Sequence, residues 1–408
     1  MSTRSWGRLA TCAAVGNRRR TAANPADARL TIGSSVPRCP TKFISRRAFL
    51  AGAAASLAHA ATPDPLVLGF LYNGPKNDLG YNQAHAEGKQ ALRRYPWVNA
   101  LEEASVPETV AAEESMRNMI HQDRASAVFA TSFGFFDPFA ISVARRNPQV
   151  QFFHCGGMWQ ADKHPKNIGI YFGFIDEVEF LSGMVAGLTT KTNRLGFVAA
   201  KPIPQVLRNI NSFTMGARSV NPRVVTQVVF TGDWVLPVRE AEASSSLADQ
   251  GNDVLTGHTG SPRVIVQMAE RRGIFANGYQ FNQSSMAPRG FLTGAEWHWG
   301  TVYCRYAEML REGKSVSDGT IPRRLTGTLK DAFCALSPFG TQVTERTRQT
   351  IAEAREKIID GSLPVYRGPI RDNTGQMRIP AGVTRRVTDP ELDSMDWLVE
   401  GVIGRTRS

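Results

Sequence analysis

The sequence contains few cysteines, no long apolar run and little net charge outside its first 60 residues. Five cysteines in 408 residues are too few for a disulfide-stabilised scaffold. No apolar stretch reaches the ~18 residues of a membrane-spanning helix, which argues against an integral membrane protein. Hydrophobic residues make up 42% of the chain, a share that argues against wholesale disorder. The length therefore predicts two or three domains' worth of folded core.

The excess of positive charge is confined to one end of the chain. The formal net charge is +12, but residues 1–60 hold ten of the 48 Lys and Arg residues and one of the 36 Asp and Glu residues. The other 38 basic and 35 acidic residues leave +3 for positions 61–408. A surface with so little excess charge, and without a basic stripe, is not expected to bind nucleic acid.

Residues 1–60 have the features of an export leader. The string S-R-R-A-F-L at 45–50 precedes a short alanine-rich apolar segment and the small-x-small pattern A-H-A at 58–60. The first string resembles the twin-arginine export motif. Because no cysteine follows the apolar segment, we expect a periplasmic protein without a lipid anchor. The alternative is an arginine pair that opens an ordinary amphipathic helix.

Short apolar runs alternate with helical stretches from Leu66 onward. This alternation, with short connections, is typical of parallel sheets covered by helices, and two such runs joined near residue 172 predict an α/β protein with two doubly wound parallel-sheet lobes. Ligands of such sheets bind beyond the carboxyl ends of the strands. We expect strands at 66–71, 127–131, 151–154, 168–172, 194–199, 224–230, 253–256 and 274–278, and helices at 81–94, 177–190, 206–220, 238–250, 263–272 and, short and amphipathic, 390–401.

Catalysis is not expected from the residues present. His154 and Cys155 are adjacent, but neighbouring residues of a strand point to opposite faces, so the histidine cannot serve the cysteine as a base. His258 lies in neither a G-x-S-x-G nor an H-E-x-x-H motif, and no phosphate-binding glycine loop is present. The three cysteines beyond residue 60 lack the spacing of a metal site. We therefore expect neither an enzyme nor a metal or cofactor.

The loops after the predicted strands are rich in aromatic and amide side chains and poor in charge. This composition suits a flat, neutral ring with hydrogen-bonding edges, although any single aromatic residue could instead pack beneath its loop. Nine strings occur in and around these loops: G-P-K-N-D-L-G-Y-N-Q (74–83), S-F-G-F (132–135), N-R-L-G-F-V (193–198), P-I-P-Q-V-L-R (202–208), S-V-N-P (219–222), T-G-D-W (231–234), A-D-Q-G-N-D-V (248–254), N-Q-S-S-M-A-P (282–288) and D-G-S-L-P-V-Y-R-G-P-I-R-D-N-T-G (360–375).

In these strings and their order, the sequence resembles the basic membrane protein (BMP) family of ABC-transporter solute-binding proteins. The resemblance implies a periplasmic-binding-protein fold of type I, with two lobes joined by a three-segment hinge and a ligand trapped by closure. Lobe 1 would comprise residues 61–172 and about 292–335, and lobe 2 residues 173–291 and about 336–380, followed by a C-terminal tail at 381–408. An inner-membrane ABC permease would be the partner of a monomeric binding protein.

Known ligands of such proteins are mostly purine nucleosides, and the resemblance implies a purine-type ligand here. The equivalents of Asn77, Asp78, Asn82 and Phe133 would hold and stack the base. Combined with the other polar and aromatic loop residues, the predicted ligand-binding set is Asn77, Asp78, Tyr81, Asn82, Phe133, Trp159, Trp234, His258, Gln280 and Trp297.

Two positions depart from the family pattern. Gln280 stands where the family string G-x-D-x-D-Q-S has its first Asp, which grips the ribose hydroxyls, and Trp297 stands where many members carry a Lys near the sugar. A carboxylate binds vicinal hydroxyls more strongly than an amide does, whereas an amide can donate and accept side by side toward an adenine-like edge. The sequence therefore predicts a free purine base or a closely related heteroaromatic ring. A purine nucleoside, a sugar, and a ligand-sensing receptor without a transport role remain alternatives.

Overall fold

A computed structural model describes residues 64–156 and 159–406, so the predicted leader and its twin-arginine motif lie outside the described residues. Its first sheet is parallel throughout, with the strand order β11-β5-β4-β3-β1-β2. The strands are β1 (Leu66–Leu71), β2 (Val98–Glu103), β3 (Ala127–Ala130), β4 (Gln151–Cys155), β5 (Ile168–Gly173) and β11 (Arg324–Gly327).

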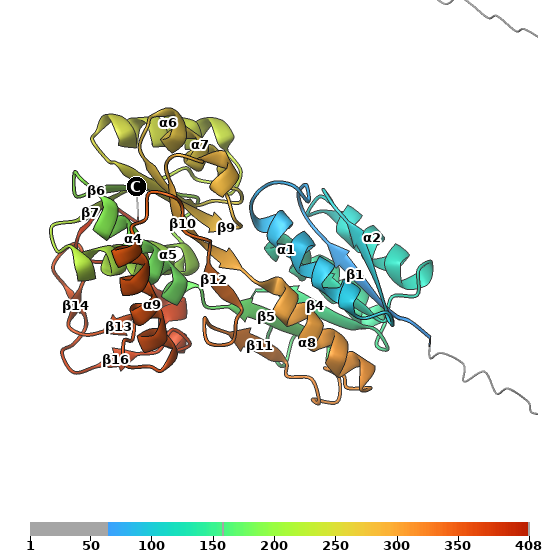
Figure 1. Ribbon diagram of the computed structural model, residues 1–408. Coiled ribbons are helices and arrows are strands. Elements are labelled where there is room, and N and C mark those ends of the chain that lie inside the picture. The colour runs from blue at the N-terminus through green and yellow to red at the C-terminus, as the bar shows by residue number, and fades with distance from the viewer. Residues whose placement is uncertain (1–63, 157–158, 407–408) are drawn as a thin grey trace, which may run out of the picture. The chain divides into compact units, whose positions relative to one another are not determined.

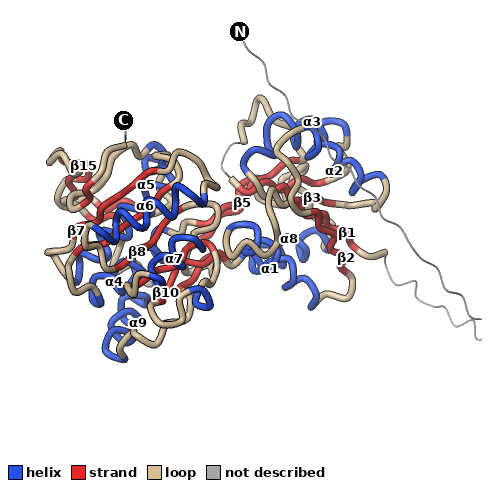
Figure 2. The backbone as a smooth tube through the Cα atoms, turned by 90° about the horizontal axis from the view of Figure 1, so that it is seen from above, coloured by secondary structure: helices blue, strands red, loops and turns tan. Residues whose placement is uncertain are grey.

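Helices cover both faces of the first sheet (Figure 2). Alternate residues of one strand point to opposite faces, so Phe70 packs on one side with Phe129, their rings 4.6 Å apart, while Leu71 packs on the other. Burial on both faces explains why the central strands β1 and β3 are continuous apolar runs in the sequence. The first face carries α1 (Tyr81–Gln90) and α8 (Trp299–Arg311), and the second carries α2 (Val110–His121) and α3 (Ile141–Arg146).

The second sheet has the order β12-β10-β9-β8-β6-β7-β17, in which only the pairing of β12 with β10 is antiparallel. Helices α4 and α5 lie against each other on one face (Figure 1), where a β-carbon at Gly183 would overlap the carbonyl of Phe213. Glycine is therefore required for the two helices to pack this closely. The elements are β6 (Arg194–Ala199), β7 (Val225–Phe230), β8 (Val254–His258), β9 (Phe275–Gln280), β10 (Phe291–Trp297), β12 (Cys334–Leu336), β17 (Val402–Ile403), α4 (Asp176–Thr189), α5 (Pro204–Val220), α6 (Pro237–Asp249), α7 (Arg263–Arg271) and α9 (Glu345–Ile359).

Within the described residues the chain passes between the sheets three times. It crosses from β5 to α4 near residue 175, from β10 to α8 at residue 298, and from β11 to β12 through residues 328–333. These three crossings and the two helix-covered sheets confirm the predicted α/β fold with a three-segment hinge. β10 and β12 both belong to the second sheet, and the predicted lobe boundaries stay predictions.

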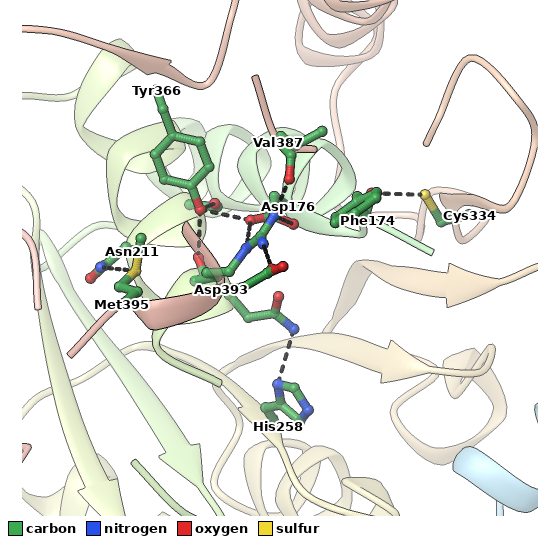
Figure 3. A network of polar contacts seen from close by, with 12 residues as sticks. Phe174, Asp176, Asn211, His258, Cys334, Tyr366, Val387, Asp393 and Met395 are labelled. Carbon is green, nitrogen blue, oxygen red and sulfur yellow. Dashed lines mark hydrogen bonds and ion pairs between the residues drawn. The ribbon is translucent and has the colours of Figure 1, made fainter. Parts of the chain in front are cut away.

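A buried ion pair lies beside the first crossing (Figure 3). Asp176, the first residue of α4, accepts two hydrogen bonds from the guanidinium of Arg208 on α5, at 2.8 and 3.0 Å. Arg208 also donates to the carboxylate of Asp393 and the carbonyl of Val387, and Tyr366 donates to Asp176 at 2.7 Å. Burial opposes the charge on Arg208, but the adjacent carboxylate of Asp176 outweighs it and raises the pKa of the guanidinium. The network joins the start of α4 to the C-terminal segment.

The prediction of a helix at 390–401 is wrong. A short 3₁₀ turn spans Pro390–Ser394, and the chain from Met395 to Gly401 contains no helix. The side chain of Asn211 donates to the carbonyl of Trp397 at 3.0 Å and accepts from the amide of Val399 at 2.7 Å. Because this side chain pairs with backbone groups that a helix would pair internally, a non-helical path is favoured. The same segment still buries Met395 and Leu398, as the apolar pattern suggested.

The rest of the C-terminal part forms two small two-stranded antiparallel sheets. β13 (Tyr366–Arg367) pairs with β16 (Thr384–Arg385), and β14 (Ile370–Arg371) pairs with β15 (Met377–Ile379). No helix among the described residues is long and apolar enough to cross a membrane. The cysteines at 155, 304 and 334 are buried and unpaired in the described part of the chain.

Candidate functional site

Each sheet has a point where its strand order reverses. In the first sheet β1 lies between β2 and β3, and in the second β6 lies between β7 and β8. At such a point, the connections that follow two adjacent strands leave toward opposite faces of the sheet. Open α/β sheets bind ligands in the crevice between these connections, beyond the carboxyl ends of the strands. The loops at residues 72–80, 131–134, 200–203 and 259–262 therefore border the candidate site.

The loop after β1 reaches the second sheet. The amide of Tyr81 donates to the carbonyl of Gly260 at 3.0 Å, and the hydroxyl of Ser261 donates to the carbonyl of Asp78. The side-chain amide of Gln283 donates to the carbonyl of Leu79 at 2.5 Å. These hydrogen bonds involve three backbone carbonyls and close the loops of the two sheets on each other.

Asp78 and Asn82 shape this loop from within. The carboxylate of Asp78 accepts from the amides of Gly80, Asn82 and Gln83 at 2.9 to 3.1 Å and from the side-chain amide of Asn82 at 2.9 Å. It thereby pairs amides of the first turn of α1 that have no partner within the helix. Asn82 in turn accepts from the amide of Gly74. The side chains of Asp78 and Asn82 therefore stabilise the loop itself. Asn77, the residue before Asp78, is exposed.

Two of the predicted stacking residues lie at the carboxyl edge of the first sheet. The phenol of Tyr81 donates to the carbonyl of Thr131, the residue after β3, at 2.5 Å, and its ring meets His85 edge-on. Burial raises the pKa of Tyr81, so the phenol is neutral. Phe133, two residues beyond Thr131, is 62% exposed. A β-carbon on Gly156, which follows β4, would lie 3.7 Å from its ring.

Trp159 makes a different set of contacts. The guanidinium of Arg323 lies 4.5 Å from the centre of its ring, and its indole nitrogen donates to the carbonyl of Pro165 at 3.5 Å. Its ring packs against the core between the first sheet, α2 and α3. Neither of these contacts joins Trp159 to another of the predicted residues, so its role in the site stays a prediction.

His258 ends β8 with both ring nitrogens occupied. Nδ1 lies 3.0 Å from the amide nitrogen of Asn209 (Figure 3) and Nε2 lies 3.3 Å from the hydroxyl of Tyr279. Burial lowers the pKa of His258 to about 3, so the ring is neutral. Trp234 lies beside it, with 5.9 Å between ring centres. His258 thus orients the side chains of Asn209 and Tyr279 through its two ring nitrogens.

Gln280 and Trp297 form a unit at the end of β9 and β10. The amide group of Gln280 donates to the carbonyl of Thr259 and accepts from the indole nitrogen of Trp297, both at 2.9 Å. Trp297 is 5% exposed and stacks on Trp299 at 4.8 Å. Gln280 has a φ of +76°, a conformation that non-glycine residues adopt at an energetic cost and that is frequent at binding sites. The side-chain amide of Gln280 and the indole nitrogen of Trp297 are thus already paired, and their role in the site stays a prediction.

Two residues that the sequence did not single out as ligands order the loop after β3. The carboxylate of Glu108 accepts from the hydroxyl of Ser132, the amide of Gly134 at 3.3 Å and the side-chain amide of Asn73 at 3.2 Å. His154 donates from Nε2 to the carbonyl of Ser132 at 3.0 Å. Glu108 was not considered because β2 and α2, between which it lies, were not predicted. The signal for His154 was its place at the end of a buried strand.

The match to known proteins covers most of the described chain. A family model described as "ABC transporter substrate-binding protein PnrA-like" (Bmp) matches residues 66–366. The protein belongs to the Bmp family. The family and the relatives below are solute-binding proteins.

In residues 64–156 and 159–406, no three His, Cys, Asp or Glu side chains lie close enough together to hold a metal ion.

Relatives of this Bmp protein carry different ligand names. The "Purine-binding protein BAB2_0673" of Brucella abortus is 32% identical over 85% of this chain and 94% of its own. TsgA13 of Haloferax volcanii, provisionally named an ABC transporter glucose-binding protein, is 31% identical over 73% of each chain. The solved structure of an ABC transporter solute-binding protein from Conexibacter woesei shares the fold, with a TM-score of 0.62 at 22% identity over 73% of this chain and 97% of its own.

Proposed function

We propose that this Bmp protein captures a free purine base for an ABC importer. The observation that carries the proposal is the pairing of Gln280 with Trp297 and the carbonyl of Thr259 at the end of β9. An amide with both polar ends occupied has little left to offer the vicinal hydroxyls of a ribose or a glucose. Trp297 fills space beside it, and the purine-binding name of the Brucella relative is in line with a base.

Aromatic faces supply the expected affinity. Phe133 is largely exposed, and Tyr81 and Trp234 are half-buried at the loops of the two sheets. Stacking contributes ~1–3 kcal/mol per base face, so two faces could give ~2–6 kcal/mol. Buried hydrogen bonds of ~1 kcal/mol each add to this. The sum approaches the ~8 kcal/mol of micromolar binding.

The proposal is tested by calorimetric titration of the protein after unfolding and refolding, which strips any ligand carried through purification. The ligands are adenine, guanine, adenosine, guanosine and glucose. We expect a free base to bind at least tenfold more tightly than its nucleoside, and glucose to give no heat. Tighter binding of a nucleoside, or of glucose as in the name of the Haloferax relative, would overturn the free-base assignment.

Gln280→Asp is expected to shift this preference toward the nucleoside. The shorter carboxylate loses the bond to Trp297 and gains the ability to accept from two ribose hydroxyls. The ratio of adenosine to adenine affinity should rise about tenfold, measured by the same titrations. Gln280→Asn is the matched control, because asparagine has the same side-chain length as aspartate but carries no charge. An equal shift in both variants would contradict the role given to the carboxylate.

We further infer delivery to a permease after export by the twin-arginine route. The support is the S-R-R-A-F-L string at 45–50 and the family match. Loss of radiolabelled adenine uptake on deletion of the gene would separate transport from a purely sensory role, in which uptake is unchanged. Replacing Arg46 and Arg47 together by Lys should retain the protein in the cytoplasm if the export route is correct.

A further inference from the structure

Phe133 stands out among the apolar side chains of the described residues. It is 62% exposed, and it is the one aromatic residue among the large apolar side chains that remain exposed there. The two following aromatic residues of the same turn, Phe135 and Phe136, are buried at 0% and 1% exposure. The turn is thus anchored in the core on one side while it presents a phenyl ring to solvent on the other.

Glu108 fixes the backbone on which this ring stands. One oxygen of its carboxylate accepts from the hydroxyl of Ser132 and the amide of Gly134, the residues on either side of Phe133. The same oxygen accepts from the side chain of Asn73, which follows β1. Glu108 itself is held in place because Thr109, the next residue, caps α2. The carboxylate therefore joins the loops that leave the two strands at the switch point.

Two further contacts complete this arrangement. A β-carbon on Gly134 would collide with the carboxyl group of Glu108, so only glycine lets the carboxylate approach this turn. In addition, Nε2 of His154 lies 3.0 Å from the carbonyl of Ser132. Since a carbonyl can only accept, Nε2 carries the proton, and burial lowers the pKa of His154 to about 4, which leaves the ring neutral. The turn is thus hydrogen-bonded by both Glu108 and His154.

We propose that Glu108 is a positioning residue for ligand capture, which holds the 132–134 turn so that Phe133 presents its ring before the ligand arrives. The inference rests on the proposed function, since it assigns the exposed ring to stacking on a planar ligand. A side chain that is already oriented loses less conformational freedom on binding than one that must be ordered by the ligand. The carboxylate acts through Phe133 and does not itself touch the ligand.

A double-mutant cycle tests this assignment. Its probe is adenine or guanine, whichever binds the wild-type protein more tightly. Glu108→Ala is expected to weaken binding about tenfold, and Phe133→Ala by tenfold or more. The double variant should bind no more weakly than Phe133→Ala alone, because a positioning residue has nothing left to position. If the two losses multiply in the double variant, the assignment is overturned.

Conservative and remote variants sharpen the test. Glu108→Gln retains an oxygen that can accept from Ser132 and Gly134, so its affinity should stay within about threefold of wild type. An affinity as low as that of Glu108→Ala would mean that the charge acts directly on the ligand, contrary to the proposal. Glu113→Ala, which removes a carboxylate paired with Arg146 on α3, is the control and should leave binding unchanged.

Hydrogen exchange of the Gly134 amide, measured without ligand, separates this inference from the proposed function. Removing the acceptor in Glu108→Ala should speed exchange at Gly134 by tenfold or more, and leave it unchanged in Glu113→Ala. If the wild type binds no purine, the purine assignment fails while the exchange result still decides the role of Glu108. Unchanged exchange in Glu108→Ala would overturn that role whatever the ligand.

Discussion

Gly80→Ala is expected to weaken ligand binding by about a hundredfold while leaving the free energy of unfolding close to that of wild type. A β-carbon at Gly80 would lie 2.5 Å from the carbonyl of Gly260 and 2.7 Å from the α-carbon of Ser261. Both obstacles are backbone atoms of the second sheet's loop and cannot rotate away. The clash arises only when the loops of the two sheets meet, so the variant folds but does not close.

Titration with the tightest purine, together with small-angle scattering with and without it, checks this prediction. A hundredfold loss corresponds to ~2.8 kcal/mol of binding free energy. Ser261→Ala is the companion variant, because it removes the hydroxyl that donates to Asp78 without adding bulk, and should cost about fivefold to tenfold. Wild-type affinity and wild-type compaction in Gly80→Ala would show that binding does not need this approach of the loops.

Arg208→Met is expected to produce the largest loss of stability, about 3–5 kcal/mol in the free energy of unfolding. The substitution keeps the apolar part of the side chain but leaves the buried carboxylate of Asp176, 3% exposed, without its charged partner. It also removes the hydrogen bonds that Arg208 donates to the carbonyl of Val387 and the carboxylate of Asp393. These bonds hold the C-terminal segment against α5. Urea unfolding followed by tryptophan fluorescence measures the loss.

Two further variants decide whether the uncompensated charge is the cause. Combining Arg208→Met with Asp176→Asn removes the stranded charge and should recover more than half of the loss. Arg355→Met breaks an ion pair with Glu356 in which both side chains are about half exposed or more, and should change stability by less than ~0.5 kcal/mol. A loss below ~1 kcal/mol in Arg208→Met would contradict the importance of the buried pair.

The sheets could be predicted because their strands are buried on both faces. Leu66–Leu71 and Arg194–Ala199 were located to the residue, since each is a continuous apolar run between polar turns. Val98–Glu103 was missed because it is an edge strand of mixed composition and only partly buried. The last four residues of the predicted helix at 81–94, Ala91–Arg94, form a 3₁₀ turn, which the apolar spacing does not distinguish from an α-helix.

The candidate site was predictable in its location and less so in the use of each side chain. Aromatic and amide residues do gather at the carboxyl ends of the strands. Whether an amide is free depends on partners distant in sequence: Gln280 is occupied by Trp297 and by Thr259, and both nitrogens of His258 by residues on α5 and β9. Asp78 is likewise occupied by the helix that follows it. Composition shows which groups are present, and only packing shows which of them remain unpaired.

The end of the chain also bears on self-association. An unpaired strand at the margin of a sheet offers backbone donors and acceptors to a strand of another copy. Beside β7 that margin is covered by Val402 and Ile403, which pair in parallel with Thr226 and Gln227. The covering strand is two residues long, too short to recruit a further strand in its turn. Val402 and Ile403 thus cap one margin of the second sheet, and the monomer stays a prediction.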